Sequence, residues 1–332
     1  MDILLEYDSG FVYHLSADDY HHGNLLYSID GVLLTRNLTS GESQVVVGDL
    51  TSGTLVSPYR EGHGEYAHFS TITSFVQMSH TQVLLVDTEN NVFRMVDRTT
   101  RNTSLVAGDP TAYGNASRDG SFSFSLFQAP RDVASGNGTT VYASTGVGLC
   151  ILDFSTEEGR VTHIYLDILP SGLAFDISLN RLYFSTEFQI FYYIPEDNTI
   201  NNVTGRSVFS NPYTDGSLQN ATFTTLTQIA VLNKDTLLAV DFFADRLRII
   251  DLNNNVTSSI CIDGGVSSGG NISSCSLRYP KSVTSFNSTA IMVGSVGSIS
   301  VLSYSGKSVI YFSLMINLHS LFHWHFVHQF KV

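Results

Sequence analysis

The sequence predicts an all-β protein, a six-bladed β-propeller of four-stranded antiparallel blades, and three observations predict it. First, one residue pattern recurs three times: a glycine, a phenylalanine seven residues later and an apolar residue six further on. Second, repeats of roughly 40–60 residues that are rich in short β-like runs are typical of propellers and solenoids. Third, only 14% of the residues are charged, and no helical periodicity is sustained before residue 305. The three glycine–phenylalanine pairs are Gly62 with Phe69, Gly120 with Phe127, and Gly216 with Phe223.

The best-preserved copy, residues 109–166, predicts four strands separated by turns rich in glycine and asparagine. Its leading loop holds a tight turn at Asp119-Gly120, a phenylalanine that fills the groove between blades (Phe127), and Pro130 where no ladder donor is needed. The predicted strands are Arg131–Ala134, Thr140–Ala143, Gly148–Asp153 and Arg160–Tyr165.

The other five units follow this plan with decreasing regularity. In the three clear copies the second strand ends at Asp87, Ser144 or Asp241. The first unit is the least regular, and its predicted strands are Phe11–Leu15, Asn24–Ile29, Val32–Leu38 and Gln44–Val47. The remaining units span about residues 50–108, 167–208, 209–263 and 264–304.

We therefore assign residues 1–306 to the propeller and residues 307–332 to a hydrophobic tail. The sixth unit shows three clear strands, so residues 2–6 or residues 308–312 must supply the fourth and close the ring. The run at 308–327 is long enough to span a membrane, but its serine, asparagine and histidine residues make insertion marginal, and a mistaken gene-model end is the alternative.

The charge of the chain excludes some partners. With a formal net charge of −13 and only 17 basic residues, none of them in a run, binding to nucleic acid is not expected. An anionic membrane surface is disfavoured for the same reason. The acidity serves either solubility or an acidic binding face.

Nine Asn-X-Ser/Thr sequons favour an extracellular or secretory-pathway location. The first fifteen residues have no basic region and do not form a signal peptide, so either the true start precedes this chain or the sequons are idle in the cytosol. Glycans at Asn115 and Asn220 would limit how much of the loop-lined face stays open. The sequon asparagines are Asn37, Asn102, Asn115, Asn137, Asn202, Asn220, Asn255, Asn271 and Asn287.

Three cysteines occur in the chain. Cys261 and Cys275 flank a loop rich in glycine and serine, and we predict a disulfide bond between them that closes it. Two buried thiols in adjacent strands are the alternative. Cys150 lies inside an apolar run and is expected to be a buried thiol.

The repeated pattern resembles the NHL-repeat family of β-propellers, over about residues 50–304. The stretch Asn180-Arg181-Leu182-Tyr183-Phe184 is also similar to the related YWTD and gluconolactonase-like six-bladed propellers. The motifs that carry the family resemblance are Arg118-Asp119-Gly120 through Phe127-Gln128-Ala129-Pro130, Thr214-Asp215-Gly216 through Ala221-Thr222-Phe223, and Val106-Ala107-Gly108-Asp109.

The resemblance leaves two classes of function open. Most such propellers bind partners, whereas a few are enzymes with zinc or calcium in the central channel, held by histidines or by carboxylates and asparagines. Neither ligand set transfers to this chain residue by residue, because its histidines recur at no common register. We therefore expect no cofactor and a non-catalytic module that binds a protein or a glycan. The alternative is a metal-dependent hydrolase or lyase with Ca²⁺ or Zn²⁺ in the channel.

One candidate binding surface comes from the loops between second and third strands, which all lie on one face of a propeller. Paired carboxylates there could bind a cation or act as acid and base. The competing interpretation is that an aspartate at a strand end caps its own turn. The acidic residues at these positions are Asp87, Glu89, Glu187, Asp241 and Asp245.

Overall fold

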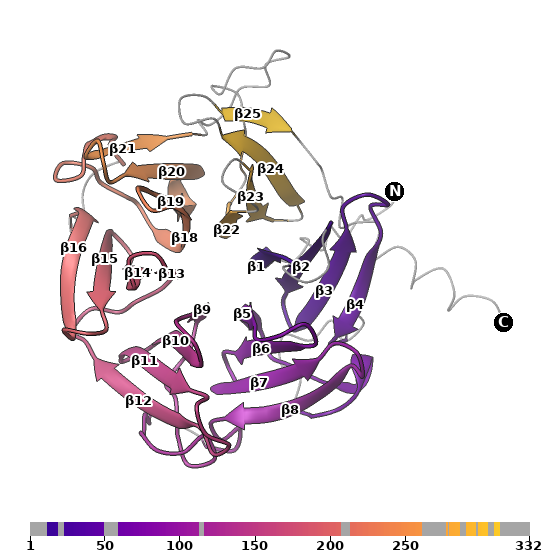
Figure 1. Cartoon of the computed structure of the whole chain (residues 1–332). Helices are drawn as coiled ribbons and strands as arrows, with labels where there is room; N and C mark the ends of the chain where they lie inside the picture. The colour runs from indigo at the N-terminus through magenta and orange to yellow at the C-terminus, as the bar shows by residue number, and fades with distance from the viewer. Residues whose placement is uncertain are drawn as a thin grey trace, which may run out of the picture.

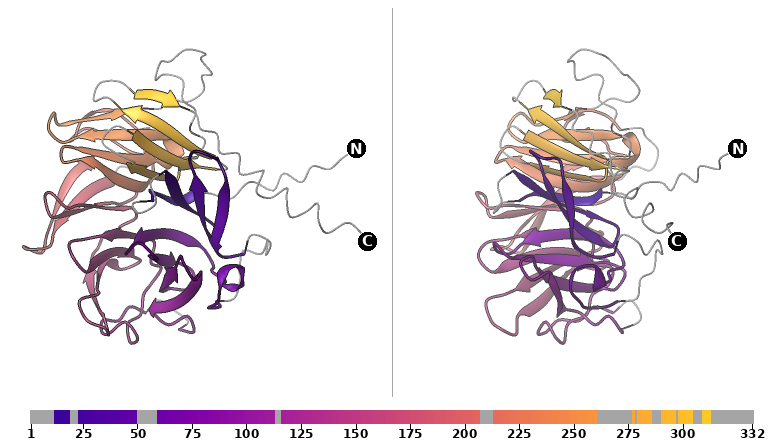
Figure 2. Two further views of the ribbon diagram at one scale, coloured as in Figure 1. Left: turned by 45° about the vertical axis from the view of Figure 1, so that its right-hand side comes forward. Right: turned by 90° about the vertical axis from the view of Figure 1, so that its right-hand side faces the viewer.

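Six antiparallel sheets surround a central axis in the order of the sequence, which confirms the predicted six-bladed propeller (Figure 1). The computed structural model describes residues 12–18, 23–49, 59–112, 116–206, 213–260, 277, 279–285, 290–296, 298–304 and 309–312. In each blade the first strand lies at the axis and the fourth at the outer edge. Seen from the side, the blades form a disc with loops on both faces (Figure 2).

The strands of blades 1 and 3 lie close to their predicted positions, and the second strand of blade 2 ends at Asp87 as predicted. Blade 3 matches best, because only its first two strands differ from the predicted bounds, by one or two residues. A single-turn 3-10 helix, η1 (Gly64–Tyr66), lies in the loop before blade 2. The strands are β1 (Val12–Ala17), β2 (Asn24–Ile29), β3 (Val32–Asn37) and β4 (Ser43–Val47) in blade 1; β5 (Ile72–Gln77), β6 (Gln82–Asp87), β7 (Val92–Asp97) and β8 (Asn102–Ala107) in blade 2; and β9 (Asp132–Ser135), β10 (Thr140–Thr145), β11 (Gly148–Asp153) and β12 (Arg160–Tyr165) in blade 3.

The last three blades keep the same order. Blade 5 carries an extra two-residue strand, β17 (Gly216–Ser217), which pairs with the outermost strand of that blade, and a second 3-10 turn, η2 (Phe242–Ala244). The strands are β13 (Leu173–Asp176), β14 (Arg181–Ser185), β15 (Gln189–Ile194) and β16 (Thr199–Gly205) in blade 4; β18 (Leu226–Asn233), β19 (Thr236–Asp241), β20 (Arg246–Asp251) and β21 (Val256–Ser259) in blade 5; and β22 (Ser282–Ser285), β23 (Ala290–Ser295), β24 (Ser298–Tyr304) and β25 (Val309–Phe312) in blade 6.

The outer strand of blade 6 is β25, which pairs antiparallel with β24. The second of the two segments considered from the sequence, residues 308–312, therefore supplies this strand, and the sixth blade extends beyond residue 306. Residues 2–6, the tail from 313 onward, Cys261 and Cys275 all lie outside the described residues, so the disulfide stays a prediction. Within the described part of the chain, no helix has the length and apolar character to cross a membrane.

The apolar core lies between neighbouring blades. One cluster joins Leu84 and Phe93 of blade 2 to Val133 and Val141 of blade 3, and similar clusters join the other blades. The repeated phenylalanines fill these grooves, because Phe69, Phe127 and Phe223 are each at most 3% exposed. Cys150 is buried in the same layer as a free thiol, as predicted.

Candidate functional site

Chemistry in a propeller is expected at the axis, where side chains from all blades approach one another. The innermost strands each place one residue there, immediately before the apolar residue of the repeat. Four of these side chains meet across the axis, from blades 1, 2, 3 and 5. The six positions, in blade order, are His14, Ser74, Asp132, Gly172, Gln228 and Ser282.

Polar side chains at several of these positions bond to the backbone of the next blade. Asp132 accepts a hydrogen bond from the Leu173 N–H of blade 4 at 2.6 Å, and Gln228 Oε1 accepts one from the Val283 N–H of blade 6 at 2.8 Å. The Ser282 hydroxyl donates to the Val12 carbonyl at 3.0 Å and so connects the last blade to the first. The axis is therefore a ring of inter-blade bonds.

His14 and Asp132 are the titratable pair of this ring. His14 Nδ1 lies 2.6 Å from Gln228 Nε2 and 3.8 Å from Asp132 Oδ1. Burial lowers the pKa of His14 to about 3. Burial raises the pKa of Asp132 to about 7, against the opposite effect of hydrogen bonds that include those from Ser74 and Gln228. Both shifts favour one arrangement, in which Asp132 holds the proton and His14 is neutral.

The residues at the axis do not fit Ca²⁺ or Zn²⁺. The two oxygens of Asp132 accept the N–H groups of Val133 and Leu173, and Gln228 Oε1 accepts that of Val283. Of the six axial residues only His14 and Asp132 carry an imidazole or a carboxylate, whereas structural and catalytic metal ions take three or more protein ligands. Among the described residues, no three His, Cys, Asp or Glu side chains come together in a way that could hold a metal ion.

A channel of about 310 Å³ continues from this ring between the inner strands of five blades. His14 and Gln228 belong to its lining, together with apolar residues such as Phe175, Ile229 and Val231 and small or hydroxyl residues such as Ser16, Ala134 and Ser285. This is the lower limit of size for a small-molecule pocket, and few polar groups converge in it.

Two of the predicted acidic residues are not on a loop face. Asp87 and Asp241 are fully buried, and each pairs with a fully buried arginine, Arg94 at 3.1 Å and Arg248 at 3.0 Å. Each aspartate also accepts hydrogen bonds from the loop that follows the repeated phenylalanine, such as that from the Ser70 N–H to Asp87 at 2.9 Å. They are structural anchors inside the blade, because a buried carboxylate needs a cation and donors around it.

The arginines also explain the acid that precedes each repeated glycine. Glu61 pairs with Arg94 at 3.0 Å, and Asp215 pairs with Arg248 at 2.9 Å. Each guanidinium lies over the phenylalanine of its own repeat, 3.9 Å from the centre of the Phe69 ring in blade 2. The Asp-Gly turn of the repeat is thus fastened to the third strand of its blade.

Blade 3 solves the same problem without arginine. Cys150 stands at the register of Arg94 and Arg248, and Thr145 stands at that of their aspartates, one residue beyond the Ser144 suggested by sequence spacing. Asp119 instead accepts hydrogen bonds from the backbone N–H and the Nδ1 of His163, at 2.8 and 2.7 Å. Both members of the buried arginine–aspartate pair are therefore replaced in this blade, the arginine by Cys150 and the aspartate by Thr145.

The remaining acidic candidates do lie in turns on one face, which we call the loop face; it comprises the turns between second and third strands and the segments that lead into each blade. Glu89 and Glu187 are exposed there. Asp245, in a left-handed conformation, accepts a hydrogen bond from the Tyr279 N–H at 2.8 Å. These three carboxylates form no metal-binding cluster with one another.

An aromatic patch lies beside Asp245 on the loop face. The ring centre of Phe242 is 5.0 Å from that of Phe243 and 5.8 Å from that of Tyr279. Phe243 is 70% exposed and Tyr279 is 51% exposed. Lys281 connects the patch to blade 1, because its ammonium lies 5.4 Å from the ring centres of both Phe242 and Tyr13.

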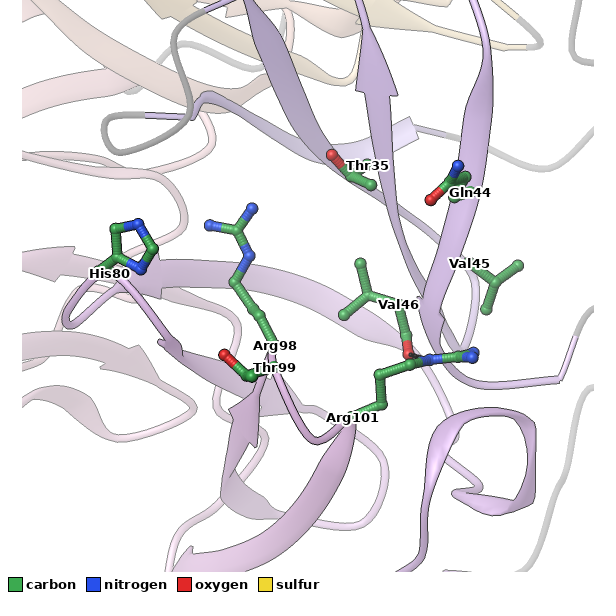
Figure 3. A pocket seen from close by; sticks show the side chains of 8 residues that line it. All are labelled: Thr35, Gln44, Val45, Val46, His80, Arg98, Thr99 and Arg101. Carbon is green, nitrogen blue, oxygen red and sulfur yellow. Dashed lines mark hydrogen bonds between the residues drawn. The ribbon is translucent and has the colours of Figure 1, made fainter.

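A second hollow, of about 300 Å³, lies between blades 1 and 2 (Figure 3). The guanidinium groups of Arg98 and Arg101 point in different directions within it (Figure 3). Arg98 is paired with the buried Asp18 at 2.5 Å, and Arg101 Nε donates to the Val46 carbonyl at 2.9 Å. Both arginines are thus occupied in joining the two blades.

The sequon asparagines within the described residues are all exposed. Four lie at the face opposite the loop face, which we call the turn face: Asn37, Asn102, Asn137 and Asn255. Asn202 lies on the outermost strand of blade 4, and Asn220 lies beside the outer-edge strand β17. Asn115, Asn271 and Asn287 lie outside the described residues.

Sequence reasoning missed the axial ring and the buried arginines for different reasons. The axial residues follow no common pattern from blade to blade, since only Ser74 and Ser282 share a residue type, so no repeat marks them. The arginines do repeat, since Arg94 and Arg248 each follow an aspartate by seven residues. That spacing was visible in the sequence and would have identified a buried pair.

Comparisons with known proteins add the fold and little else. No family model matches the chain, and no curated protein matches it in sequence. An auxiliary nutrient binding protein from Bacteroides thetaiotaomicron is similar in structure, with a TM-score of 0.63 and 13% identity over 87% of this chain and 67% of that one. A chain of a nidogen/laminin complex has a TM-score of 0.56 and 11% identity, over 86% of this chain and 92% of that one.

Virginiamycin B lyase from Staphylococcus aureus is also similar, with a TM-score of 0.54 and 12% identity over 93% of this chain and 86% of that one. Binding proteins and an enzyme thus share this architecture. At such identities the likeness establishes the β-propeller fold, and function has to be argued from the residues.

Proposed function

We propose that this chain is an NHL-type propeller of the extracellular space or secretory pathway, which binds a protein partner on its loop face and catalyses no reaction. The observation that carries the proposal is the aromatic patch of Phe242, Phe243 and Tyr279, whose last two members are more than half exposed. Exposed aromatic side chains on a rigid support are the typical anchors of protein interfaces.

The framework beneath the patch supports binding rather than chemistry. Hydrogen bonds to neighbouring blades occupy the polar side chains at the axis, so the ring holds its loops in fixed positions. A preorganised surface loses less entropy on association. The face of such a ring offers the area that a standard interface needs, about 800 Å² on each partner.

The placement of the sequons gives a second, independent support. None of the six described sequon asparagines lies in the turns between second and third strands, and only Asn220 lies in a segment that leads into a blade, that of blade 5. Glycans at the other five positions would cover the turn face and the outer rim and leave the aromatic patch accessible.

The test compares two variants that each remove exposed apolar side chains. Phe243→Ser with Tyr279→Asn removes the patch, and asparagine tolerates the left-handed backbone at position 279. Ile177→Ser with Leu179→Ser removes a comparable exposed pair from the turn face and is the control.

Proteins enriched on the wild-type chain from extracellular and membrane fractions are identified and then titrated against each purified variant. We expect an identified partner to lose at least roughly tenfold in affinity with the patch variant and less than about twofold with the control. Equal losses with both variants, or binding to arrayed glycans with no protein partner, would contradict the proposal.

A further inference from the structure

We infer that the partner segment which docks on the loop face is cationic, with an apolar residue next to its positive charges. This inference rests on the proposed function and adds the chemistry of the partner. It follows from the residues that continue the aromatic patch across the mouth of the axis into blades 1 and 2.

The patch extends as a stripe through Lys281 and Tyr13. Lys281 lies against the rings of Phe242 and Tyr13. The Asp30 carbonyl accepts the Ile72 N–H at 2.6 Å, and the Glu89 N–H donates to the Ser70 hydroxyl at 3.2 Å, so both residues lie against the same loop, Ser70–Ile72. Their negative charges contribute, after burial, to raising the pKa of Tyr13. Asp30 and Glu89 are themselves exposed. The stripe thus has an aromatic end in blades 5 and 6 and an acidic end in blades 1 and 2.

Acidic groups also flank the aromatic end. The Asp245 carboxylate accepts a hydrogen bond from the Tyr279 N–H. The Glu187 carbonyl accepts the N–H of Leu226, and the carbonyl of the preceding Thr225 accepts the N–H of Phe242, so the Glu187 turn lies near the patch. Four carboxyl groups therefore border the stripe: Asp30, Glu89, Glu187 and Asp245.

Among the described residues two cations lie near these acids, Lys281 and Arg131. Lys281 is half-buried between two rings, and burial together with the charge of Arg131 lowers its pKa. Counted over its described residues, the stripe keeps a negative balance within a chain of formal net charge −13. A lysine or arginine of a partner would meet carboxylates at one end, and an adjacent apolar side chain would pack on Phe243 at the other.

The probe is a short fluorescein-labelled peptide of lysine, leucine and serine, with matched peptides in which glutamate replaces lysine or serine replaces leucine. Binding is followed by fluorescence anisotropy at about 50 and 300 mM salt, because screening weakens exposed charge pairs. The acidic end is neutralised by Asp30→Asn with Glu89→Gln; asparagine suits the left-handed backbone of position 30.

The control for total charge is Glu157→Gln with Glu158→Gln, two exposed residues of the β11–β12 turn on the turn face. Both double variants change the net charge of the chain equally, so non-specific attraction cancels in the comparison. Thermal melts confirm that each variant folds.

We expect the lysine–leucine peptide to bind and the acidic variant to lose roughly three- to tenfold in affinity, against less than about twofold for the control. Replacing lysine by glutamate should abolish binding, and replacing leucine by serine should weaken it. The inference is wrong if the control loses as much, if the glutamate peptide binds equally, or if no binding is detected. If the patch variant loses an identified partner while Asp30→Asn with Glu89→Gln retains it at both salt concentrations, the proposed function stands and this inference fails.

Discussion

At the scale of single residues, a buried arginine stabilises the interior of each of two blades, blade 2 and blade 5. Arg248 lies between Asp241, which is fully buried, and Asp215, which is partly exposed. Loss of the arginine would leave a buried carboxylate without its cation, which typically costs about 3–5 kcal/mol. Blade 3 shows that the same blade can form without this ion pair, because uncharged Thr145 and Cys150 stand at these two positions.

Arg248→Cys should therefore lower the free energy of unfolding by about 3–5 kcal/mol in chemical denaturation. The double variant Asp241→Thr with Arg248→Cys copies the blade 3 arrangement and should recover a large part of this loss. A double variant that is less stable than Arg248→Cys would show that Asp241 contributes independently of the arginine.

The pair at the axis makes a prediction about pH. Between pH about 4 and 6.5 the unfolded chain carries one proton on His14, and the folded chain carries one on Asp132, so this pair adds no pH dependence to stability. With His14→Gln only Asp132 titrates, and its pKa is about 7 folded and 3.8 unfolded. The folded state then binds more protons, so stability falls as pH rises, by up to about 1.4 kcal/mol per pH unit.

The opposite variant reverses the sign. With Asp132→Asn only His14 remains, and its pKa falls from 6.5 unfolded to about 3 folded, so stability rises with pH over the same window. Denaturation at several pH values, each compared with the wild type, measures both slopes. If stability changed with pH by the same slope in both variants, the folded chain would not carry its proton on Asp132 with His14 neutral.

At the scale of strands, the sequence predicted positions well and contacts poorly. All four strands of blade 3 and of blade 1 lie within about two residues of their predicted bounds, because turn residues and alternating apolar residues define them locally. Asp87 and Asp241 were placed correctly at strand ends, yet their burial depends on a loop and a third strand that only the folded blade brings together.

The contact between blades 4 and 5 depends on one glycine. A Cβ atom at Gly172 would lie 2.5 Å from the Cα atom of Gln228, and the backbone there cannot move without shifting β18. Gly172→Ala should therefore cost about 3 kcal/mol through overpacking.

The matched control is Gly138→Ala, at a left-handed turn residue where a Cβ atom would meet nothing within 4 Å. This substitution isolates backbone strain and should cost only about 1 kcal/mol. Thermal or urea melts compare the two, and a larger loss at position 138 would refute the close-contact explanation.

At the scale of the whole molecule, the sequence predicted the number of blades and missed the centre. The repeat reveals six units because their spacing is regular. The axial residues belong to different chemical types, including histidine, aspartate and glutamine, and their roles appear only when six blades converge. The exposure of Phe243 and Tyr279 likewise follows from loop geometry that no local pattern encodes.

The same convergence predicts the response to metal removal. Because only one imidazole and one carboxylate stand among the six axial residues, extensive dialysis against a chelator should leave the unfolding midpoint within about 1 °C of its value in added Ca²⁺ or Zn²⁺. A clear rise of the midpoint with either ion, lost in Asp132→Asn, would favour the metal-dependent hydrolase or lyase instead.

The bond from Ser282 to Val12 has a consequence for synthesis of the chain. These residues are 270 positions apart, so at about 5–20 residues per second the first blade waits roughly 10–50 s on the ribosome for the segment that completes its inner surface. Until then, the apolar side of β1 has no neighbour from blade 6. We therefore expect chaperones to engage the N-terminal third of the nascent chain, and release to coincide with the emergence of β22.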